Sequence, residues 1–232
     1  MTVSEPQGHP IPATGVAGMP VTLLLFDGCD LLDVGGPYEV ILTANRIQEA
    51  AGASAPFAVR TVSLDGGPVR AYGGLQLTPD AALTPGPGVF VVPGAIDVPD
   101  RDTALLAAIR AGAQAADLVA SVCTGSLLLA AADVLDGVPS TTHHLDVGRL
   151  AERLDDHLAV TGARWVDAGR VVTAGGLASG IAMALHLVAR LASPELAWAT
   201  AQRLEYPWSP DDGLTVAIGA GSGAAPEPDP GR

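Results

Sequence analysis

Short apolar runs alternate along this chain with segments that have helical spacing. The apolar runs are Val21–Phe26, Gly88–Val92 and Leu118–Val122, and each gives way to turn or polar residues. Of the helical segments, one begins at Pro37 and another spans Asp102–Ala113. Strands that alternate with helices form a mainly parallel sheet with helices on both faces. We therefore predict an α/β three-layer sandwich of the flavodoxin-like kind.

Further turn signals divide the rest of the chain. Gly73-Gly74 and Asp167-Ala168-Gly169 each separate two short segments, which predicts two hairpins. Ser193 is expected to cap a helix that begins at Pro194. The segments predicted from these signals are strands over Phe57–Leu64 and Ser140–His144, hairpins over Val69–Leu77 and Arg164–Thr173, and a helix over Ser179–Leu191.

Length and composition favour one domain. The chain has 232 residues, of which 48% are apolar, and a chain of this length buries roughly 70% or more of its unfolded surface. Proline and glycine are frequent at both ends. We expect a disordered leader over residues 1–19, a single α/β domain over 20–210 and a flexible tail over 211–232. Cys29 and Cys123 lie far apart in the sequence, so no disulfide framework is predicted.

The charged residues exclude several classes of function. All 12 basic residues are arginine, which rules out mechanisms that need a lysine, such as Schiff-base chemistry or a Walker A motif. The net charge of −13 leaves no basic stripe for nucleic acid. No apolar stretch reaches the ~20 residues that span a bilayer, and no positive charge precedes Arg46 as a signal peptide would require. We expect a cytoplasmic protein that binds neither nucleic acid nor membrane.

Cys123 is the first candidate for chemistry. Ligands of parallel sheets bind beyond the carboxyl ends of the strands, and Cys123 lies there, between the run ending at Val122 and a small-residue helical run from Gly125. The N-terminus of that helix would favour a thiolate and make Cys123 a nucleophile. The alternative is a small buried hydrophobic residue.

Asp33 is the candidate partner acid, because it follows the first strand among apolar neighbours that would raise the pKa of its carboxyl. A protonated Asp33 would pass a proton to substrate. Its alternative role is a helix N-cap before Gly35-Gly36-Pro37. Of the other polar residues in this segment, we expect loop charges at Asp27 and Asp30, packing at Cys29 and a first-turn helix position at Glu39.

Two further segments are candidates for the walls of the site. The N–H groups of Gly94 and Ala95 would serve as oxyanion donors, or else form a plain turn. The Thr124 hydroxyl would orient a water or the substrate, or cap the helix. His143 and His144 would supply a base for Cys123 or form a surface pair. Adjacent residues of a strand point to opposite faces, so we predict no metal site.

These residues together resemble the ThiJ/PfpI superfamily, which has the class I glutamine amidotransferase-like fold. The matching stretches are Leu31–Glu39, Val92-Pro93-Gly94, Ser121–Ser126, Thr141-Thr142-His143, Thr173–Gly176 and Gly180–Leu185, in that order. The resemblance implies a Cys123 nucleophile, an Asp33 acid and a supporting Thr124 hydroxyl. It also implies a pocket formed by Gly94, Ala95, His143 and Gly36.

Cys-Thr-Gly at residues 123–125 is similar to the isonitrile hydratase branch of the superfamily and to the sensor domains of AraC-type regulators. The chain shows no room for a C-terminal helix-turn-helix, which favours the hydratase. The resemblance implies a homodimer that acts on a small molecule without a cofactor. Two departures from the family pattern stand out: Ala95, where glycine is usual, bears on the oxyanion donors, and His144, where tryptophan is frequent, bears on the substrate.

We therefore predict a cysteine-dependent hydratase that adds water to an isonitrile and gives an N-substituted formamide. One alternative is another cysteine activity of the superfamily, of the glyoxalase or amidase and peptidase type. This alternative needs a histidine within hydrogen-bond reach of Cys123. The other alternative is a non-enzymatic sensor of a small molecule or an oxidant.

Overall fold

The computed structural model describes residues 18–154 and 158–216. This part of the chain holds an eight-stranded sheet and a separate two-stranded hairpin. The strands are β1 (Met19–Leu24), β2 (Phe57–Ser63), β3 (Val69–Arg70), β4 (Gln76–Leu77), β5 (Ala81–Ala82), β6 (Val89–Val92), β7 (Leu118–Ser121), β8 (Trp165–Ala168), β9 (Val171–Ala174) and β10 (Leu214–Thr215). The helices are α1 (Leu31–Ala50), α2 (Thr103–Ala115), α3 (Gly125–Ala131), α4 (Val147–Ala151), α5 (Ser179–Leu191), α6 (Pro194–Arg203) and the 3₁₀-helix η2 (Pro210–Asp212).

The strand order of the large sheet is β10-β8-β9-β7-β6-β1-β2-β5. All neighbours pair in parallel except β8 and β9, which form an antiparallel hairpin. The mainly parallel α/β sandwich expected from the sequence is therefore confirmed. The chain leaves β1 toward β2 and returns to β6 on the other side of β1, so a switch of strand order lies between β1 and β6. The carboxyl ends of β1, β6 and β7 meet beside this switch, where ligands of such sheets bind.

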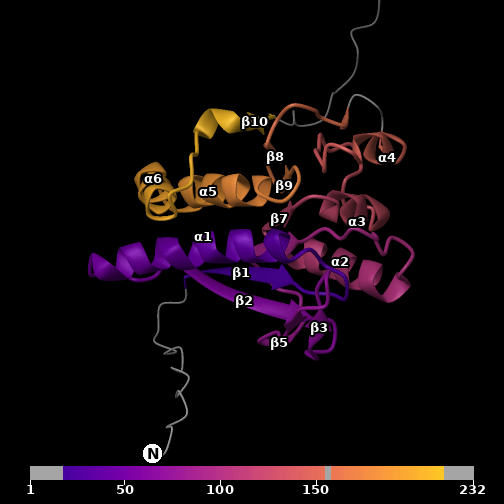
Figure 1. Cartoon of the computed structure of the whole chain (residues 1–232), viewed down its shortest axis with the longest axis horizontal. Coiled ribbons are helices and arrows are strands. Elements are labelled where there is room, and N and C mark those ends of the chain that lie inside the picture. Colours follow the sequence, from indigo (N-terminus) through magenta and orange to yellow (C-terminus); the bar gives the residue numbers. More distant parts are fainter. Residues whose placement is uncertain (1–17, 155–157, 217–232) are drawn as a thin grey trace, which may run out of the picture.

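The helices form two layers (Figure 1). α1, α5 and α6 pack against one another, whereas α2 packs against α3 and α3 against α4. The crossovers from β1 to β2 and from β6 to β7 run in opposite directions across the sheet. Right-handed crossovers of this kind place α1 and α2 on opposite faces. None of the described helices has the length and apolar run needed to cross a membrane.

Glycines let the helices of both layers approach the sheet closely. A Cβ atom on Gly112 of α2 would lie 2.8 Å from the ring of Phe90 in β6. One on Gly180 of α5 would lie 2.8 Å from Val122 Cγ1, directly before Cys123. Larger residues at these positions would push the helices away from the strands that carry the candidate site.

Several local predictions are confirmed. β3 and β4 form the hairpin around Gly73-Gly74, and β8 and β9 form the second hairpin. α5 has the predicted bounds of Ser179–Leu191. Ser193 caps α6, because its hydroxyl accepts a hydrogen bond from the Leu196 N–H at 3.1 Å.

Two local predictions were wrong. α1 begins at Leu31 rather than Pro37, because the Asp30 side chain accepts the Leu32 N–H at 3.1 Å and caps the helix earlier. Residues 140–144 form no strand, and only Ser140 makes an isolated bridge, to Ala159. Side-chain hydrogen bonds replace the strand ladder there, since the Thr173 hydroxyl accepts the Thr141 N–H at 2.8 Å.

The sheet reaches into both segments that were expected to lie outside the domain. Met19, placed in the leader, begins β1 and pairs with Phe57. Leu214 and Thr215, placed in the tail, form β10 beside β8. The rest of the predicted leader (1–17), the rest of the tail (217–232) and residues 155–157, which include His157, lie outside the described residues.

Two glycine-to-alanine variants test whether close backbone packing forms the turn after β7. A Cβ on Gly125 would lie 2.3 Å from the Val92 carbonyl oxygen, so Gly125→Ala should lower the free energy of unfolding by about 1–3 kcal/mol through overpacking. The matched control is Gly35→Ala in α1, where a Cβ meets nothing within 4 Å. This control should raise stability by up to about 1 kcal/mol through helix propensity. Urea denaturation measures both, and equal effects would contradict the packing described here.

Candidate active site

Cys123 occupies the turn between β7 and α3 with a backbone φ of +55°. This left-handed conformation costs a non-glycine residue about 1–3 kcal/mol. Hydrogen bonds hold the residue there: its N–H donates to the carbonyls of Ala174 (3.2 Å) and Gly175 (3.0 Å). Its own carbonyl accepts the hydroxyls of Ser126 (3.2 Å) and Thr142 (3.0 Å). The backbone of Cys123 is thus fixed from β9 and from the Thr142 segment together.

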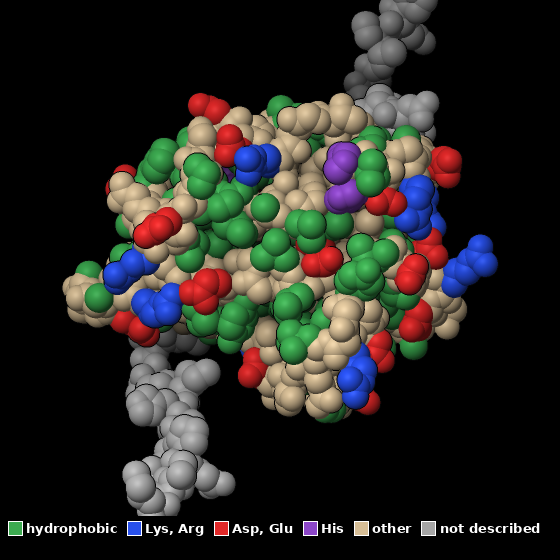
Figure 2. Space-filling model, viewed as in Figure 1, with side chains coloured by type: hydrophobic (Ala, Val, Ile, Leu, Met, Phe, Trp, Pro, Cys, Tyr) green, Lys and Arg blue, Asp and Glu red, His purple; other side chains and the backbone are tan. Residues whose placement is uncertain are grey.

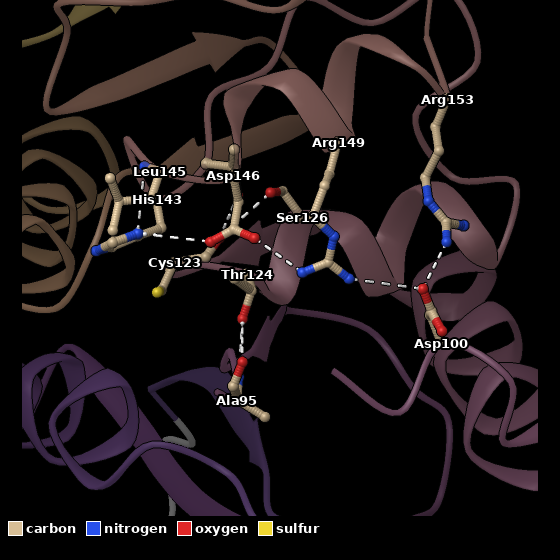
Figure 3. Close-up of polar contacts among 11 residues, drawn as sticks. Ala95, Asp100, Cys123, Thr124, Ser126, His143, Leu145, Asp146, Arg149 and Arg153 are labelled. Carbon is tan, nitrogen blue, oxygen red and sulfur yellow. Dashed lines mark hydrogen bonds and ion pairs between the residues drawn. The ribbon is translucent and has the colours of Figure 1, made fainter. Parts of the chain in front are cut away.

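Thr124 joins the turn to the end of β6 (Figure 3). Its hydroxyl donates to the Ala95 carbonyl at 2.7 Å and accepts the Ala95 N–H at 2.9 Å. It makes no side-chain cap on α3. The Thr124 hydroxyl therefore uses its donor and an acceptor position on the Ala95 backbone. In this structure it does not cap α3, and its donor is not free for the predicted contact with a water or substrate. Its role in this structure is to position the two segments.

The predicted oxyanion donors are also engaged. The Gly94 N–H donates to Asp33 Oδ2 at 2.9 Å, and the Ala95 N–H goes to Thr124. Ala95 has no positive φ, so its Cβ causes no backbone strain. The oxyanion prediction was therefore wrong for this conformation of the chain, because these N–H groups hold the site together instead.

Asp33 is fully buried in the first turn of α1, and Asp30 rather than Asp33 caps the helix. Its Oδ1 atom has no hydrogen-bond partner among the described residues. Burial raises the pKa of the Asp33 carboxyl to about 7, against the opposing effect of the Gly94 N–H. The expected rise of this pKa is confirmed, and Asp33 can exchange a proton near neutral pH.

The Cys123 side chain differs from expectation. Burial, and next the negative charge of Asp33, raise the pKa of its thiol to about 12. The backbone N–H groups of Thr124 and Leu177 lower the pKa but do not outweigh these causes. The prediction that the helix terminus would favour a free thiolate was wrong, because α3 is short and the thiol is buried beside a carboxylate. At neutral pH the Cys123 thiol therefore keeps its proton.

Leu177 is a member of the site that was not predicted from the sequence. It follows β9 with a φ of +50°, and its N–H lowers the pKa of both Asp33 and Cys123. Its side chain is 40% exposed, so the position matters through its main chain. The preceding Gly175-Gly176 was the only signal in the sequence that the chain bends sharply here.

His143 and His144 lie beside this site rather than on opposite faces of a strand. Their ring centroids are 4.5 Å apart. His143 Nδ1 lies 3.5 Å from Asp146 Oδ2, and Asp146 also pairs with Arg149 (Figure 3). Within the described chain, neither imidazole forms a hydrogen bond with the Cys123 sulfur. The structure therefore gives no support to a histidine base for Cys123.

A cleft of about 550 Å³ opens beside the backbone of Cys123, and neither Cys123 nor Asp33 is among the residues that line it. Its walls are Thr141–His144, Val147, Thr161–Arg164, Gly175–Leu177 and Ser179. Three of these residues contact or influence Cys123. Thr142 and Gly175 form hydrogen bonds with its backbone, and the Leu177 N–H lowers the pKa of its thiol. The volume suits a small molecule.

Other candidates have structural roles. Gly36 packs against α5, where a Cβ would lie 3.0 Å from Ile181 Cγ1, and it does not line the cleft. Cys29 is buried and forms an isolated bridge with Ala95. Glu39 pairs with Arg46 on α1. Within the described residues, no His, Cys, Asp and Glu side chains gather in a group of three or more that could hold a metal ion.

The model of the DJ-1/PfpI family matches residues 19–190. The chain belongs to the DJ-1/PfpI family. The isonitrile hydratase of Pseudomonas putida is 35% identical over 199 residues, which are 82% of this chain and 79% of the hydratase. The transcriptional regulator GbdR of Pseudomonas aeruginosa is 30% identical over 193 residues, which are 80% of this chain and 50% of the regulator. The chain thus spans about half the length of that regulator.

Solved structures support the same assignment. A THiJ/PfpI family protein from Pseudomonas syringae superposes with a TM-score of 0.70 at 25% identity, covering 88% of this chain and 85% of that protein. Drosophila melanogaster DJ-1beta superposes with a TM-score of 0.64 at 18% identity, covering 82% of this chain and 99% of that protein. The second likeness shows a shared fold.

The raised pKa of Asp33 predicts a specific pH dependence of stability. The folded chain holds the Asp33 proton up to about pH 7, whereas the unfolded chain releases it near pH 3.9. Asp33 therefore stabilises the fold below pH 3.9, and this stability is lost as pH rises to about 7. The free energy of unfolding of Asp33→Asn, minus that of wild type, should increase by about 4 kcal/mol between pH 4 and pH 8. A difference that stays constant across this range would refute the buried, protonated Asp33.

The thiol pKa predicts slow alkylation. In a Cys29→Ala background, iodoacetamide should modify Cys123 at pH 8 more slowly than a free thiol, whose pKa is ~8.5. Adding Asp33→Asn should speed the reaction, because removal of the carboxylate lowers the pKa of the thiol. Rates are measured by mass spectrometry of the Cys123 peptide against pH. A rate that reaches its plateau below pH 8.5 in wild type would disagree with this account.

Proposed function

We propose that the chain is a cysteine-dependent hydratase that converts an isonitrile to an N-substituted formamide. The observation that carries the proposal is the pairing of a buried Cys123 thiol with a buried Asp33 carboxyl whose pKa is about 7. The similarity to an isonitrile hydratase over most of both chains supports the choice of reaction. The residues and steps below belong to this proposal.

The first step adds the thiol across the terminal carbon of the isonitrile. Above pH 7 the pair carries one proton, on Cys123, and Asp33 is ionised. As the S–C bond forms, Asp33 takes the thiol proton and delivers it to the same carbon. The product is a thioimidate in which R–N=CH is bonded to sulfur. The Oδ1 atom of Asp33, which has no partner among the described residues, is free to carry that proton while Oδ2 stays on Gly94.

The second step consumes water. Asp33, ionised again, accepts a proton from a water molecule as the water oxygen bonds to the thioimidate carbon, and it passes this proton to the nitrogen. The C–S bond then breaks, the carbonyl of the formamide forms, and the remaining hydroxyl proton passes to sulfur. One water is consumed and the enzyme returns to its starting state. Thr124 does not orient this water, because Ala95 occupies its hydroxyl.

A binding role without turnover is the second candidate. The similarity to the regulator GbdR over most of this chain favours it, and so does the weak acidity of the Cys123 thiol. The same cleft would then hold a small molecule that is not converted. Turnover distinguishes the two candidates directly.

The test measures, by chromatography, how much N-cyclohexylformamide the protein forms from cyclohexyl isonitrile. We expect turnover by wild type and none by Cys123→Ala. Asp33→Asn should lose a factor of about 10²–10⁴ in kcat, the usual contribution of a positioned acid–base group. In wild type, kcat/KM should rise tenfold per pH unit below about pH 7 and then level off, because only the ionised Asp33 accepts the thiol proton.

Cys29→Ala provides the matched control, since Cys29 is the other buried cysteine. It should keep formamide production while Cys123→Ala abolishes it. Wild type that turns over no isonitrile from an alkyl and aryl panel would contradict the hydratase proposal. In that case, saturable binding of the same isonitriles would favour the sensor.

A further inference from the structure

The cleft beside Cys123 differs in charge from the rest of the molecule. The chain carries a net charge of −13, yet the residues that line the cleft include no aspartate and no glutamate. Arg164, His143 and His144 line it instead, with hydroxyl groups from three threonines and Ser179. All of these side chains carry hydrogen-bond donors, and the Thr142 hydroxyl uses its proton on the Cys123 carbonyl. In Figure 2, histidine side chains gather at one place on a face that also shows hydrophobic, acidic and basic side chains.

Arg164 is fixed at one wall of this cleft. Its Nη1 atom donates to the Tyr206 hydroxyl at 2.7 Å, and that hydroxyl donates to the Ala178 carbonyl at 3.0 Å. Asp212 stands behind the guanidinium, with Oδ2 3.9 Å from Nε. These contacts orient the group and leave Nη2 without a hydrogen bond among the described residues. A planar guanidinium held in this way is suited to a carboxylate.

The second wall is formed by the histidine pair. Asp146 contacts His143 at Nδ1 and also forms an ion pair with Arg149. The negative charge of Asp146 is therefore partly neutralised by Arg149. A Cβ on Gly176 would lie 2.3 Å from His143 Cδ2, which shows how closely the loop after β9 fits this ring. His144 is exposed and stands against the His143 ring. It places an imidazole at a position where the sequence departs from the superfamily pattern.

We propose that this cleft binds a carboxylate group on the substrate, with Arg164 as its main partner and His144 as a second donor. The inference rests on the proposed function, and it names the substrate class as isonitriles that carry a carboxylate near the isocyano group. The isocyano carbon reaches Cys123 past Leu177, while the carboxylate stays in the cleft. Arg164 and His144 thus determine specificity, and Cys123 and Asp33 carry the reaction.

Binding of the reaction product tests this without turnover. Calorimetry with the Cys123→Ala variant compares N-formylglycine with its uncharged methyl ester. The acid should bind about tenfold or more tightly than the ester, because a charge-assisted pair with Arg164 is among the stronger hydrogen bonds. Arg164→Gln should remove this preference, and Arg164→Lys should restore part of it through its charge. His144→Asn should reduce the preference less than Arg164→Gln.

The control is Arg46→Gln, which removes an exposed arginine paired with Glu39 outside the cleft. It should leave the preference for the acid unchanged. Equal affinities for acid and ester in Cys123→Ala, or a preference that survives Arg164→Gln in a folded variant, would overturn the carboxylate site.

Kinetics separate this inference from the proposed function. Wild type should show a higher kcat/KM for isocyanoacetate than for its methyl ester, and Arg164→Gln should lower that ratio through KM. If neither isonitrile is converted but the acid preference in binding holds, the hydratase proposal fails and the carboxylate site stands. If both are converted equally well, the carboxylate site fails and the hydratase stands.

Discussion

The hydrogen bond from the Gly94 N–H to the Asp33 carboxyl determines the rest of the site. It joins the start of α1 to the end of β6 at the switch of strand order, and it does so in a place from which water is excluded. Since only one N–H satisfies Oδ2 and none of the described residues bonds to Oδ1, burial dominates and the pKa of Asp33 rises to about 7. The same carboxylate holds the Cys123 proton in place. The ionisation of the Cys123 thiol therefore depends on the charge of Asp33.

The backbone around this pair stores strain that packing must offset. Cys123 and Leu177 both have left-handed φ angles, and each such residue costs about 1–3 kcal/mol. Carbonyl groups of β9 and its following loop hold the Cys123 N–H, and Thr124 joins the turn to Ala95. Cys123 is thus held against the ends of β6 and β9. This arrangement fixes the sulfur, the carboxyl and the neighbouring cleft relative to one another.

Most of the fold could be predicted from the sequence, because strands and helices have different hydrophobic spacing. The parallel sheet, both hairpins and the α5 helix followed from that spacing and from glycine and proline. For Asp33 the sequence left open a carboxyl of raised pKa or a helix N-cap, and burial of the side chain decides for the first. The start of α1 did not, since the Asp30 cap overrides the signal of Pro37. The strand expected over residues 140–144 failed because the Thr141 N–H donates to the Thr173 hydroxyl and the Thr142 hydroxyl donates to the Cys123 carbonyl.

The errors at the site have one physical cause. Sequence shows which polar groups are near a strand end, but not which of them bond to each other. The N–H groups of Gly94 and Ala95 were expected to face a substrate, whereas Asp33 and Thr124 accept them. Leu177 and Arg164 were missed because their positions are visible only in three dimensions. Leu177 matters through its left-handed backbone, and Arg164 because it lines the cleft.

Asp33 keeps its proton up to about pH 7 inside the folded chain. Infrared difference spectroscopy of protein labelled with ¹³C at the aspartate carboxyl groups measures this directly, with Asp33→Asn used to assign the band. We expect a protonated-carboxyl band, absent from Asp33→Asn, that disappears with a midpoint near pH 7. A carboxyl that is already ionised at pH 5 would contradict the account.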